Sequence, residues 1–234
     1  MSAVGGAVAL VDFDRTLSDA DSVMSDLLDG VLGLTGLQAV QAFAQAHEIV
    51  HERYPERHDD RLLTFQLLLD QFQTPGSDAT VEKVQERFDA AWSSSWRSPR
   101  LFPDALPFLR GLRARGFRLY LATGDHAPQK AAHLLRLAGE PLLLGAFDPD
   151  SLGHEKGSRG YVLRALELAG APDPQSVWVV GDSLRNDMAP ALQEGLRALW
   201  VNRNGAPLRP QDPAPTYAVR DLQEALAIIS RAPA

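Results

Sequence analysis

Short apolar runs alternate with helical patterns along most of this chain, and this alternation limits the folds open to it. Each run is continuously apolar, which is typical of strands covered on both faces of a parallel sheet. The runs predict strands at Ala7–Phe13, Arg118–Thr123, Pro141–Phe147, Val177–Asp182 and Arg197–Asn202.

Helical patterns separate these strands. The predicted helices are Asp104–Arg115, Pro128–Ala138 and Ser158–Ala169, with Pro or Gly at the ends where each is favoured. Alternation of strand and helix predicts right-handed βαβ units and an α/β fold, a doubly wound, Rossmann-like parallel sheet. After a proline-rich extended connector at Gly205–Pro215, we expect an edge strand at Thr216–Val219 and a last helix at Leu222–Ile229.

The alternation fails between about residues 21 and 96, where no strand-like run occurs. Apolar residues recur there at helical spacing in four stripes, and Pro75-Gly76 separates the third from the fourth. We therefore predict an all-helical cap subdomain at residues 19–99, inserted after the first strand of a core formed by residues 1–18 and 100–234. Hinges are expected near Ser18–Ser22 and Ser98–Pro103.

Composition narrows the classes of partner. The chain has 234 residues, 45% of them hydrophobic, and a formal net charge of -7 without a basic stripe, which argues against nucleic acid as a partner. It has no cysteine, so disulfides and thiolate chemistry are excluded. No run of 18 apolar residues and no secretory leader pattern is present, so we expect a cytoplasmic protein with no membrane partner.

Polar residues follow the predicted strands where each strand ends. Asp12 and Asp14 follow the first strand, Thr123 the second, and Asp182 and Asp187 the fourth. Ligands of open α/β sheets bind at this carboxyl edge, where the strand order reverses. If the first and fourth strands are neighbours, the four carboxylates converge, and such oxygen ligands suit Mg²⁺ with a substrate phosphate.

Lys156 is the nearest basic candidate between the second and fourth of these polar segments. The chain has 20 arginines and only 3 lysines, so a lysine just ahead of a predicted helix is unusual here. Two interpretations stay open: a solvated surface lysine, or a compact ammonium that neutralises a phosphate and a carboxylate together.

Taken in order, these segments resemble the four motifs of the haloacid dehalogenase (HAD) superfamily, in its aspartate-nucleophile phosphatase branch. The matching segments are Asp12–Leu17, Thr123-Gly124, Lys156 and Gly181–Asp187. The resemblance covers about residues 7–18 and 100–230, and the four motifs in this order are highly specific. The helical insert resembles the family only in its location, that of a type-one helical cap.

The resemblance implies a role for each matching residue. Asp12 would attack phosphorus and form an aspartyl phosphate, and Asp14 would protonate the leaving oxygen and then activate water. Thr123 and the Gly124 amide would hold phosphoryl oxygens. Lys156 would offset the charge that develops on the phosphoryl group.

The same resemblance implies an Mg²⁺ site. Asp182 would bind the ion together with the Asp12 carboxylate and the Asp14 main-chain carbonyl. Asp187 would lie behind these ligands or bind through water, with Asn186 helping to orient it.

Three positions depart from the family pattern. The family usually has Gly where Arg15 stands, so the turn after Asp14 is expected to differ. It often has Asn where Gly124 stands, which affects that phosphate contact, and Pro where Gly157 stands. None of the three removes a catalytic group.

The cap offers candidates for substrate contact and one competing motif. Its candidates are Arg53, Tyr54, Arg57 and His58, with a solvated loop as the favoured interpretation. The segment His47–His51 matches H-E-x-x-H, the pattern of zinc proteases, but a third ligand is missing at the usual spacing. A solvent-facing helix is the favoured interpretation of that motif.

The sequence thus predicts a Mg²⁺-dependent hydrolase of a small phosphorylated metabolite. A sugar-phosphate mutase on the same core motifs remains an alternative, and a non-catalytic phospho-ligand-binding module is the alternative of another class. A relative that cleaves phosphonates needs a lysine of the cap that forms a Schiff base. The one lysine of the predicted cap, Lys83, lies in its fourth helix, so this alternative ranks low. Dehalogenases of the family lack an acid two residues after the nucleophile, so Asp14 favours phosphoryl chemistry. The substrate and the oligomeric state are left open.

Overall fold

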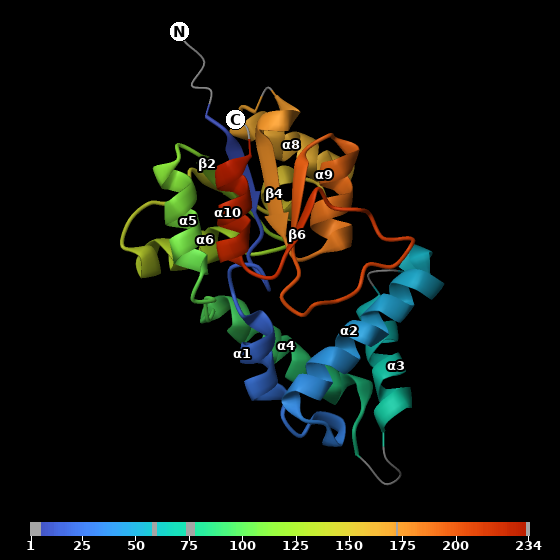
Figure 1. The fold of residues 1–234 in the computed structure, drawn as a ribbon. Coiled ribbons are helices and arrows are strands. Elements are labelled where there is room, and N and C mark those ends of the chain that lie inside the picture. The colour runs from blue at the N-terminus through green and yellow to red at the C-terminus, as the bar shows by residue number, and fades with distance from the viewer. Residues whose placement is uncertain (1–5, 58–59, 74–77, 172, 233–234) are drawn as a thin grey trace. The chain divides into compact units, whose positions relative to one another are not determined.

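The computed structural model describes residues 6–57, 60–73, 78–171 and 173–232 (Figure 1). Internal contacts divide the chain into two compact units. One consists of Met1–Ser18 with Leu101–Ala234, and the other is Asp19–Arg100. We call them the sheet unit and the helical unit.

In the described part of the sheet unit, six strands form one sheet in the order β3-β2-β1-β4-β5-β6, and every neighbouring pair is parallel. The strands are β1 (Val8–Val11), β2 (Arg118–Ala122), β3 (Gly145–Phe147), β4 (Val177–Gly181), β5 (Arg197–Val201) and β6 (Tyr217–Val219). Ala9 of β1 pairs with Leu119 on one side and with Trp178 on the other, so the strand order reverses at β1. This is the predicted doubly wound sheet. Its strands β1 and β4 are neighbours, which is the condition for the carboxylates that follow them to converge.

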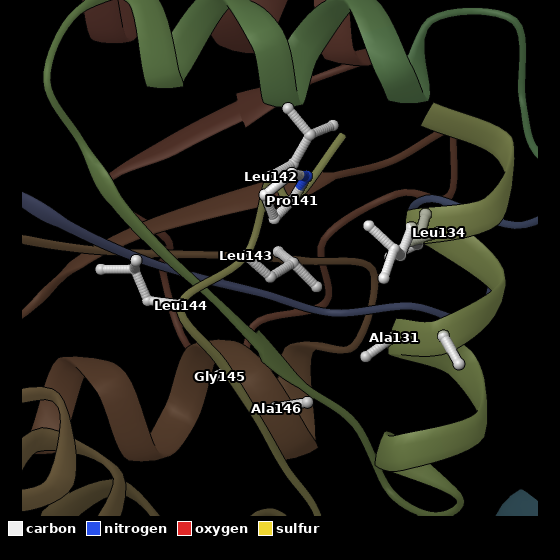
Figure 2. A pocket seen from close by; sticks show the side chains of 10 residues that line it. Ala131, Leu134, Pro141, Leu142, Leu143, Leu144, Gly145 and Ala146 are labelled. Atoms are coloured by element: carbon white, nitrogen blue, oxygen red, sulfur yellow. The ribbon is translucent and has the colours of Figure 1, made fainter. Parts of the chain in front are cut away.

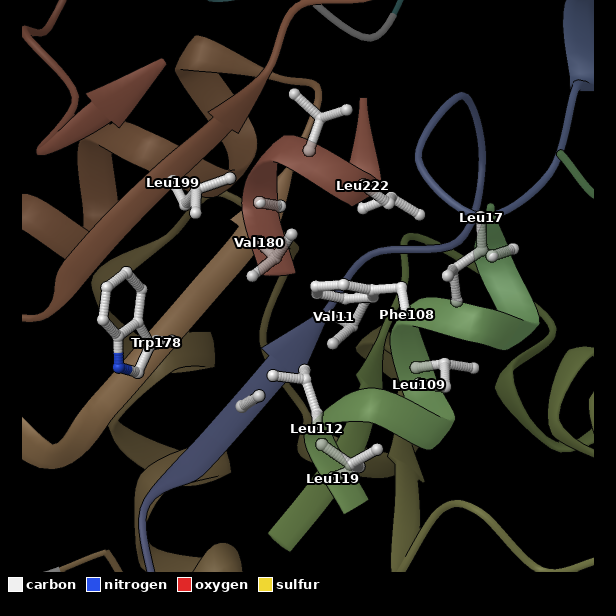
Figure 3. Packing of buried hydrophobic residues seen from close by; sticks show 14 of the residues in the cluster. Val11, Leu17, Phe108, Leu109, Leu112, Leu119, Trp178, Val180, Leu199 and Leu222 are labelled. Carbon is white, nitrogen blue, oxygen red and sulfur yellow. The ribbon is translucent and has the colours of Figure 1, made fainter. Parts of the chain in front are cut away.

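Helices cover both faces of the sheet, which explains why its strands carry apolar residues on both faces. On one face, α5 (Ala105–Ala114) and α10 (Leu222–Arg231) pack Phe108 and Leu222 against Val11 and Val180 (Figure 3). The other face packs against helices that include α8 (Arg159–Ala169) and α9 (Ala189–Gln193). All four residues of β1 are buried, the pattern expected for a central strand of a doubly wound sheet.

The helix ends follow the sequence signals. Helix α6 (Ala127–Ala138) has Pro128 in its first turn and ends at Gly139, whose left-handed backbone (φ 70°) suits a residue without a Cβ. Helix α8 begins at Ser158, whose side chain accepts a hydrogen bond from the Tyr161 amide, and ends at Gly170.

The strand predicted at Pro141–Phe147 is too long. Only Gly145–Phe147 forms β3, although the Leu144 amide already donates to the carbonyl of Leu119 over 2.7 Å. The preceding residues are apolar because Leu142 packs in the core on the α5 side of the sheet, and Pro141 has no amide to donate to a ladder. Burial, rather than strand pairing, accounts for the apolar run.

The helical unit contains α1 (Ala20–Leu28), α2 (Gly36–Arg53), α3 (Arg61–Phe72) and α4 (Val81–Arg97). These four α-helices surround a core of their own that includes Met24, Phe65 and Phe88. The first helical stripe is shorter than its apolar residues suggest, because the chain turns at Gly30 (φ 80°) and continues in a single 3₁₀ turn. Pro75-Gly76 lies outside the described residues.

Short elements complete the fold. They are the 3₁₀ turns η1 (Val31–Gly33), η2 (Pro55–Arg57) and η3 (Pro174–Ser176), the π-helical turn η4 (Leu184–Met188) and helix α7 (Pro149–Leu152). The connector at residues 205–215 has no helix or strand, as predicted. No helix in the described ranges is long and apolar enough to cross a membrane.

Candidate active site

Strand β1 delivers Asp12 and Asp14 to the carboxyl edge of the sheet. The Asp12 amide still donates to the Val180 carbonyl of β4 over 2.9 Å, so the ladder holds the backbone of Asp12 in place. The chain then turns tightly, and the amides of Leu17 and Ser18 both donate to the carbonyl of Phe13. Asp12 is 5% exposed. A carboxylate this buried requires partners of opposite charge.

Strand β4 delivers Asp182 and Asp187 to the same edge. The π-helical turn η4 follows directly and carries Asp187 back toward the strand, where one carboxyl oxygen accepts from the Ser183 amide over 3.0 Å. A Cβ added at Gly181 would overlap the Asp187 carboxyl group, so the return of this side chain needs glycine at that position. The indole of Trp200 donates to the Asp182 carbonyl over 2.7 Å and steadies the turn.

Three of these carboxylates form a cluster, which we call the acidic triad: Asp12, Asp182 and Asp187. One oxygen from each lies within 4.8 Å of the other two. Burial, followed by the charge of Asp12, raises the pKa of Asp182 well above its usual value. Burial also raises the pKa of Asp187 to about 6, against the opposing effect of Lys156. Ionisation of all three carboxyl groups is therefore unfavourable in free energy, and a bound cation would reduce this cost.

Lys156 supplies part of that positive charge. It lies in the turn before α8, and its ammonium donates to Asp12 Oδ1 and forms an ion pair with Asp187 Oδ1 at 2.9 Å. Burial by itself lowers the pKa of Lys156, but the charges of Asp12 and Asp187 outweigh this and raise it well above the usual value. The interpretation of Lys156 as a solvated surface lysine is thus wrong. Gly157 has φ 95°, and a Cβ there would meet Asn186 Oδ1 at 2.7 Å, so glycine lets this turn approach η4.

The structure adds a second lysine that the sequence analysis missed. Lys130 of α6 is fully buried and donates to Asp14 Oδ2 over 2.6 Å and to Thr123 Oγ1 over 3.0 Å. It also donates to Asp125 Oδ1. The signal that drew attention to Lys156, a rare lysine in an arginine-rich chain, applied equally to Lys130.

Asp14 lies beside the acidic triad but its side chain does not belong to it. Burial raises the pKa of Asp14 above its usual value, and the charge of Lys130 opposes the rise. Thr123 is buried at the end of β2, and its carbonyl accepts from the hydroxyl of Tyr161 over 3.0 Å. Gly124 follows at an exposed position. The site thus joins the ends of β1, β2 and β4 with the turn before α8.

Arg15 stands where the family usually has glycine. Its backbone is left-handed (φ 60°), so the turn after Asp14 has the conformation that favours glycine, with arginine in its place. The Arg15 charge opposes the rise in the pKa of Asp182.

We expect Arg15→Gly to leave the free energy of unfolding within about 1 kcal/mol of wild type, because relief of backbone strain offsets the added freedom of the unfolded chain. Arg15→Val should lower it by roughly 2 kcal/mol, since a β-branched residue tolerates this conformation poorly. Urea unfolding of the three proteins measures both changes. Equal midpoints for Gly and Val would contradict the strain argument.

The helical unit carries the residues that the sequence offered as candidates for substrate contact. Arg53 and Tyr54 lie on its surface, and Arg57 forms an ion pair with Asp60 at 2.6 Å. His58 lies outside the described residues. Substrate contact by these residues stays a prediction.

The H-E-x-x-H segment forms part of α2, and the Nε2 atoms of His47 and His51 lie 3.1 Å apart. Among the residues that the structure describes, the acidic triad is the one group of three or more metal-ligating side chains. The third ligand that a zinc site needs is thus absent from the described part of α2 and its surroundings.

A cavity of about 240 Å³ lies between α6 and the segment that leads into β3 (Figure 2). Its walls are apolar and include Leu134, Leu142 and Ala146. None of the lining residues can act as an acid, base or nucleophile, so the chemistry of the acidic triad has no counterpart there.

Comparison with known proteins gives one family. The model of that family, described as a haloacid dehalogenase-like hydrolase, matches residues 7–195. A phosphoserine phosphatase of Thermus thermophilus is 32% identical over 61% of this chain, an alignment that spans only 56% of that enzyme. A glyceraldehyde 3-phosphate phosphatase of Methanopyrus kandleri is 24% identical over 83% of this chain and 82% of that enzyme.

Solved structures share the fold. The putative hydrolase YfnB of Bacillus subtilis, solved with magnesium bound, has a TM-score of 0.74 at 22% identity and covers 96% of this chain and 98% of its own. The L-2-haloacid dehalogenase of Xanthobacter autotrophicus has a TM-score of 0.69 at 18% identity, over 98% and 100% of the two chains. Phosphatases and dehalogenases therefore both occur among the proteins that this chain resembles.

Proposed function

We infer that this chain, which belongs to the haloacid dehalogenase-like hydrolase family, is a magnesium-dependent phosphatase of small phosphomonoesters. One observation carries the proposal: Asp12 of the acidic triad and Asp14 beside it, two residues apart, are each held by a lysine of their own. A nucleophile and a separate acid–base group are what hydrolysis through a covalent phosphoenzyme requires.

Asp12 is the proposed nucleophile. One of its oxygens accepts from Lys156, while Oδ2 is buried and has no hydrogen-bond partner among the described residues. Attack on phosphorus forms a bond from an Asp12 oxygen to phosphorus and breaks the bond from phosphorus to the leaving oxygen. Lys156, fixed between Asp12 and Asp187, offsets the negative charge that the phosphoryl group brings.

Asp14 is the proposed acid and base. In the first step it gives a proton to the leaving oxygen, and in the second it takes a proton from the water that attacks the phosphoaspartate, which restores Asp12 and releases phosphate. A raised pKa, caused mainly by burial, suits a carboxyl group that must carry a proton. Thr123 and the Gly124 amide are the proposed contacts for phosphoryl oxygens.

The acidic triad fits Mg²⁺. Its three oxygens lie within 4.8 Å of one another, they are hard ligands, and the Asp12 oxygen without a partner is buried. We propose Asp12, Asp182 and the Asp14 carbonyl as ligands, with Asp187 behind them or binding through water. The ion would neutralise the triad and the phosphoryl oxygens, which lets an anionic substrate approach an anionic nucleophile.

The helical unit is the proposed cap. It is inserted between β1 and α5, and such a unit can select the leaving group and exclude water when it closes. The substrate class rests on the chemistry of the site and on the two relatives named as phosphatases.

The test is phosphate release across a panel of phosphorylated metabolites, with Mg²⁺ and with EDTA, and halide release from 2-chloropropionate in parallel. We expect Mg²⁺-dependent phosphate release and no halide release. Transfer of phosphate between positions of a sugar phosphate without net release would favour the mutase. Halide release without phosphate release would overturn the proposal.

The acid role of Asp14 gives a separate prediction. Asp14→Asn should lower the rate of phosphoenzyme formation about 10²–10⁴-fold for phenyl phosphate, because its leaving group needs a proton, and much less for 2,4-dinitrophenyl phosphate. Rapid-quench measurement of the first turnover gives both rates. Equal losses with the two substrates would count against an acid at this position.

A further inference from the structure

Lys130 brings a buried positive charge to the site from an element outside the four motifs. It lies in α6, seven residues after Thr123, and its side chain is 0% exposed. Two of the three lysines of this chain therefore lie at the candidate site, one on each of the paired aspartates.

The Lys130 ammonium uses all three of its donors within the protein. It donates to Asp14 Oδ2 over 2.6 Å, to Thr123 Oγ1 over 3.0 Å and to Asp125 Oδ1. The ring of Phe13 lies beneath it, 5.5 Å from the nitrogen to the ring centroid. An ammonium whose donors are all occupied is poorly placed to bind a phosphate itself. Its effect must pass through the groups that it holds.

The two oxygens of Asp14 differ as a result. Oδ2 is held by Lys130, while Oδ1 is buried and has no hydrogen-bond partner in the part of the chain that the structure describes. A carboxylate held at one oxygen by a rigid, buried donor keeps a single orientation, which presents its other oxygen in a constant direction. Constant orientation of the acid is what rapid proton transfer to a leaving oxygen requires.

We propose that Lys130 is a positioning residue for Asp14: it holds Oδ2, so that Oδ1 is the atom that exchanges the proton with the leaving group. This inference rests on the proposed function and adds a residue to its machinery. It also gives the two lysines different tasks, since Lys156 holds the nucleophile and Lys130 holds the acid.

A double-mutant cycle with Lys130→Met and Asp14→Asn tests this assignment. With phenyl phosphate and Mg²⁺, we expect Lys130→Met to lower the rate of phosphoenzyme formation about 100-fold in the wild-type background. In the Asp14→Asn background the same change should cost less than about threefold, because the group on which Lys130 acts has already lost its function. With 2,4-dinitrophenyl phosphate, Lys130→Met should cost less than about tenfold, since this leaving group needs little protonation.

Two further variants keep the test interpretable. Lys83→Met removes the exposed lysine of α4, which pairs with Asp78, and should match wild type in rate and in unfolding midpoint. Lys130→Gln retains N–H donors toward Asp14, so with phenyl phosphate it should lose less rate than Lys130→Met. If the methionine variant does not unfold cooperatively, the cycle is run with Lys130→Gln, and its smaller loss should again disappear in the Asp14→Asn background.

The outcomes separate the two claims. Equal losses in both Asp14 backgrounds, or with both substrates, would overturn the positioning role while wild-type phosphatase activity still supported the proposed function. Failure of wild type to release phosphate from any phosphomonoester would overturn both.

Discussion

Asp12→Asn abolishes phosphate release if Asp12 is the nucleophile. We expect kcat for the best phosphomonoester to fall at least about 10⁴-fold, the scale of loss when an enzyme is deprived of its nucleophile. The amide keeps the shape of the side chain and still accepts from Lys156, but it cannot form the bond to phosphorus. Steady-state kinetics with Mg²⁺ measure the change.

Intact-mass analysis of acid-quenched reactions makes this result specific to the covalent step. Wild type should show a phosphoryl adduct during turnover, and Asp12→Asn should show none. Asp150→Asn is a matched control, because Asp150 is an exposed carboxylate of the same unit, on α7. It should keep wild-type activity. Activity or an adduct that survives both Asp12→Asn and Asp12→Ala would assign the nucleophile elsewhere.

Without metal, the protein should become less stable as the pH rises from about 5 to 7.5. Burial raises the pKa of Asp187 to about 6 and raises that of Asp182 well above its usual value, so in this range the native state binds more protons than the unfolded state. Stability then falls with rising pH, through the folded-state pKa values. The carboxyl group of Asp148 has a lowered pKa and loses its stabilising effect only below the usual value of 3.8, outside this range.

We expect the thermal midpoint in EDTA to be about 5 °C lower at pH 7.5 than at pH 5, on the scale of 2–4 °C per kcal/mol for a chain of this size. Millimolar Mg²⁺ should reverse the loss at pH 7.5 and have little effect at pH 5, where the triad is partly protonated. Asp187→Asn should reduce both the pH effect and the Mg²⁺ effect, whereas Asp150→Asn should reduce neither. A midpoint in EDTA that rises toward pH 7.5 would contradict the raised pKa values of Asp182 and Asp187.

Several features of the fold were predictable because each depends on neighbours in sequence. The continuous burial of β1, the end of α6 at Gly139 and the cap of α8 at Ser158 follow from local apolar pattern and backbone preference. The same reasoning failed at residues 141–144, because an apolar run reports burial and does not distinguish a strand from a buried segment that leads into one.

The candidate site was predictable in part. Asp12, Asp182 and Lys156 follow strands or precede a helix in the order of known motifs, so their convergence could be inferred before any coordinates. Lys130 could not be placed in this way, because a lysine on an amphipathic helix is solvated in most proteins. Only the packing of α6 against the sheet turns its side chain inward to Asp14 and Thr123.

The sequence by itself determined that this chain forms a parallel α/β sheet with a helical insert, and that carboxylates leave its strands at one edge. These are properties of periodicity and strand direction, which need no coordinates. Tertiary structure alone decided which oxygen of each carboxylate a lysine holds and which oxygen remains without a partner, since hydrogen-bond geometry and burial depend on distances between elements far apart in the chain.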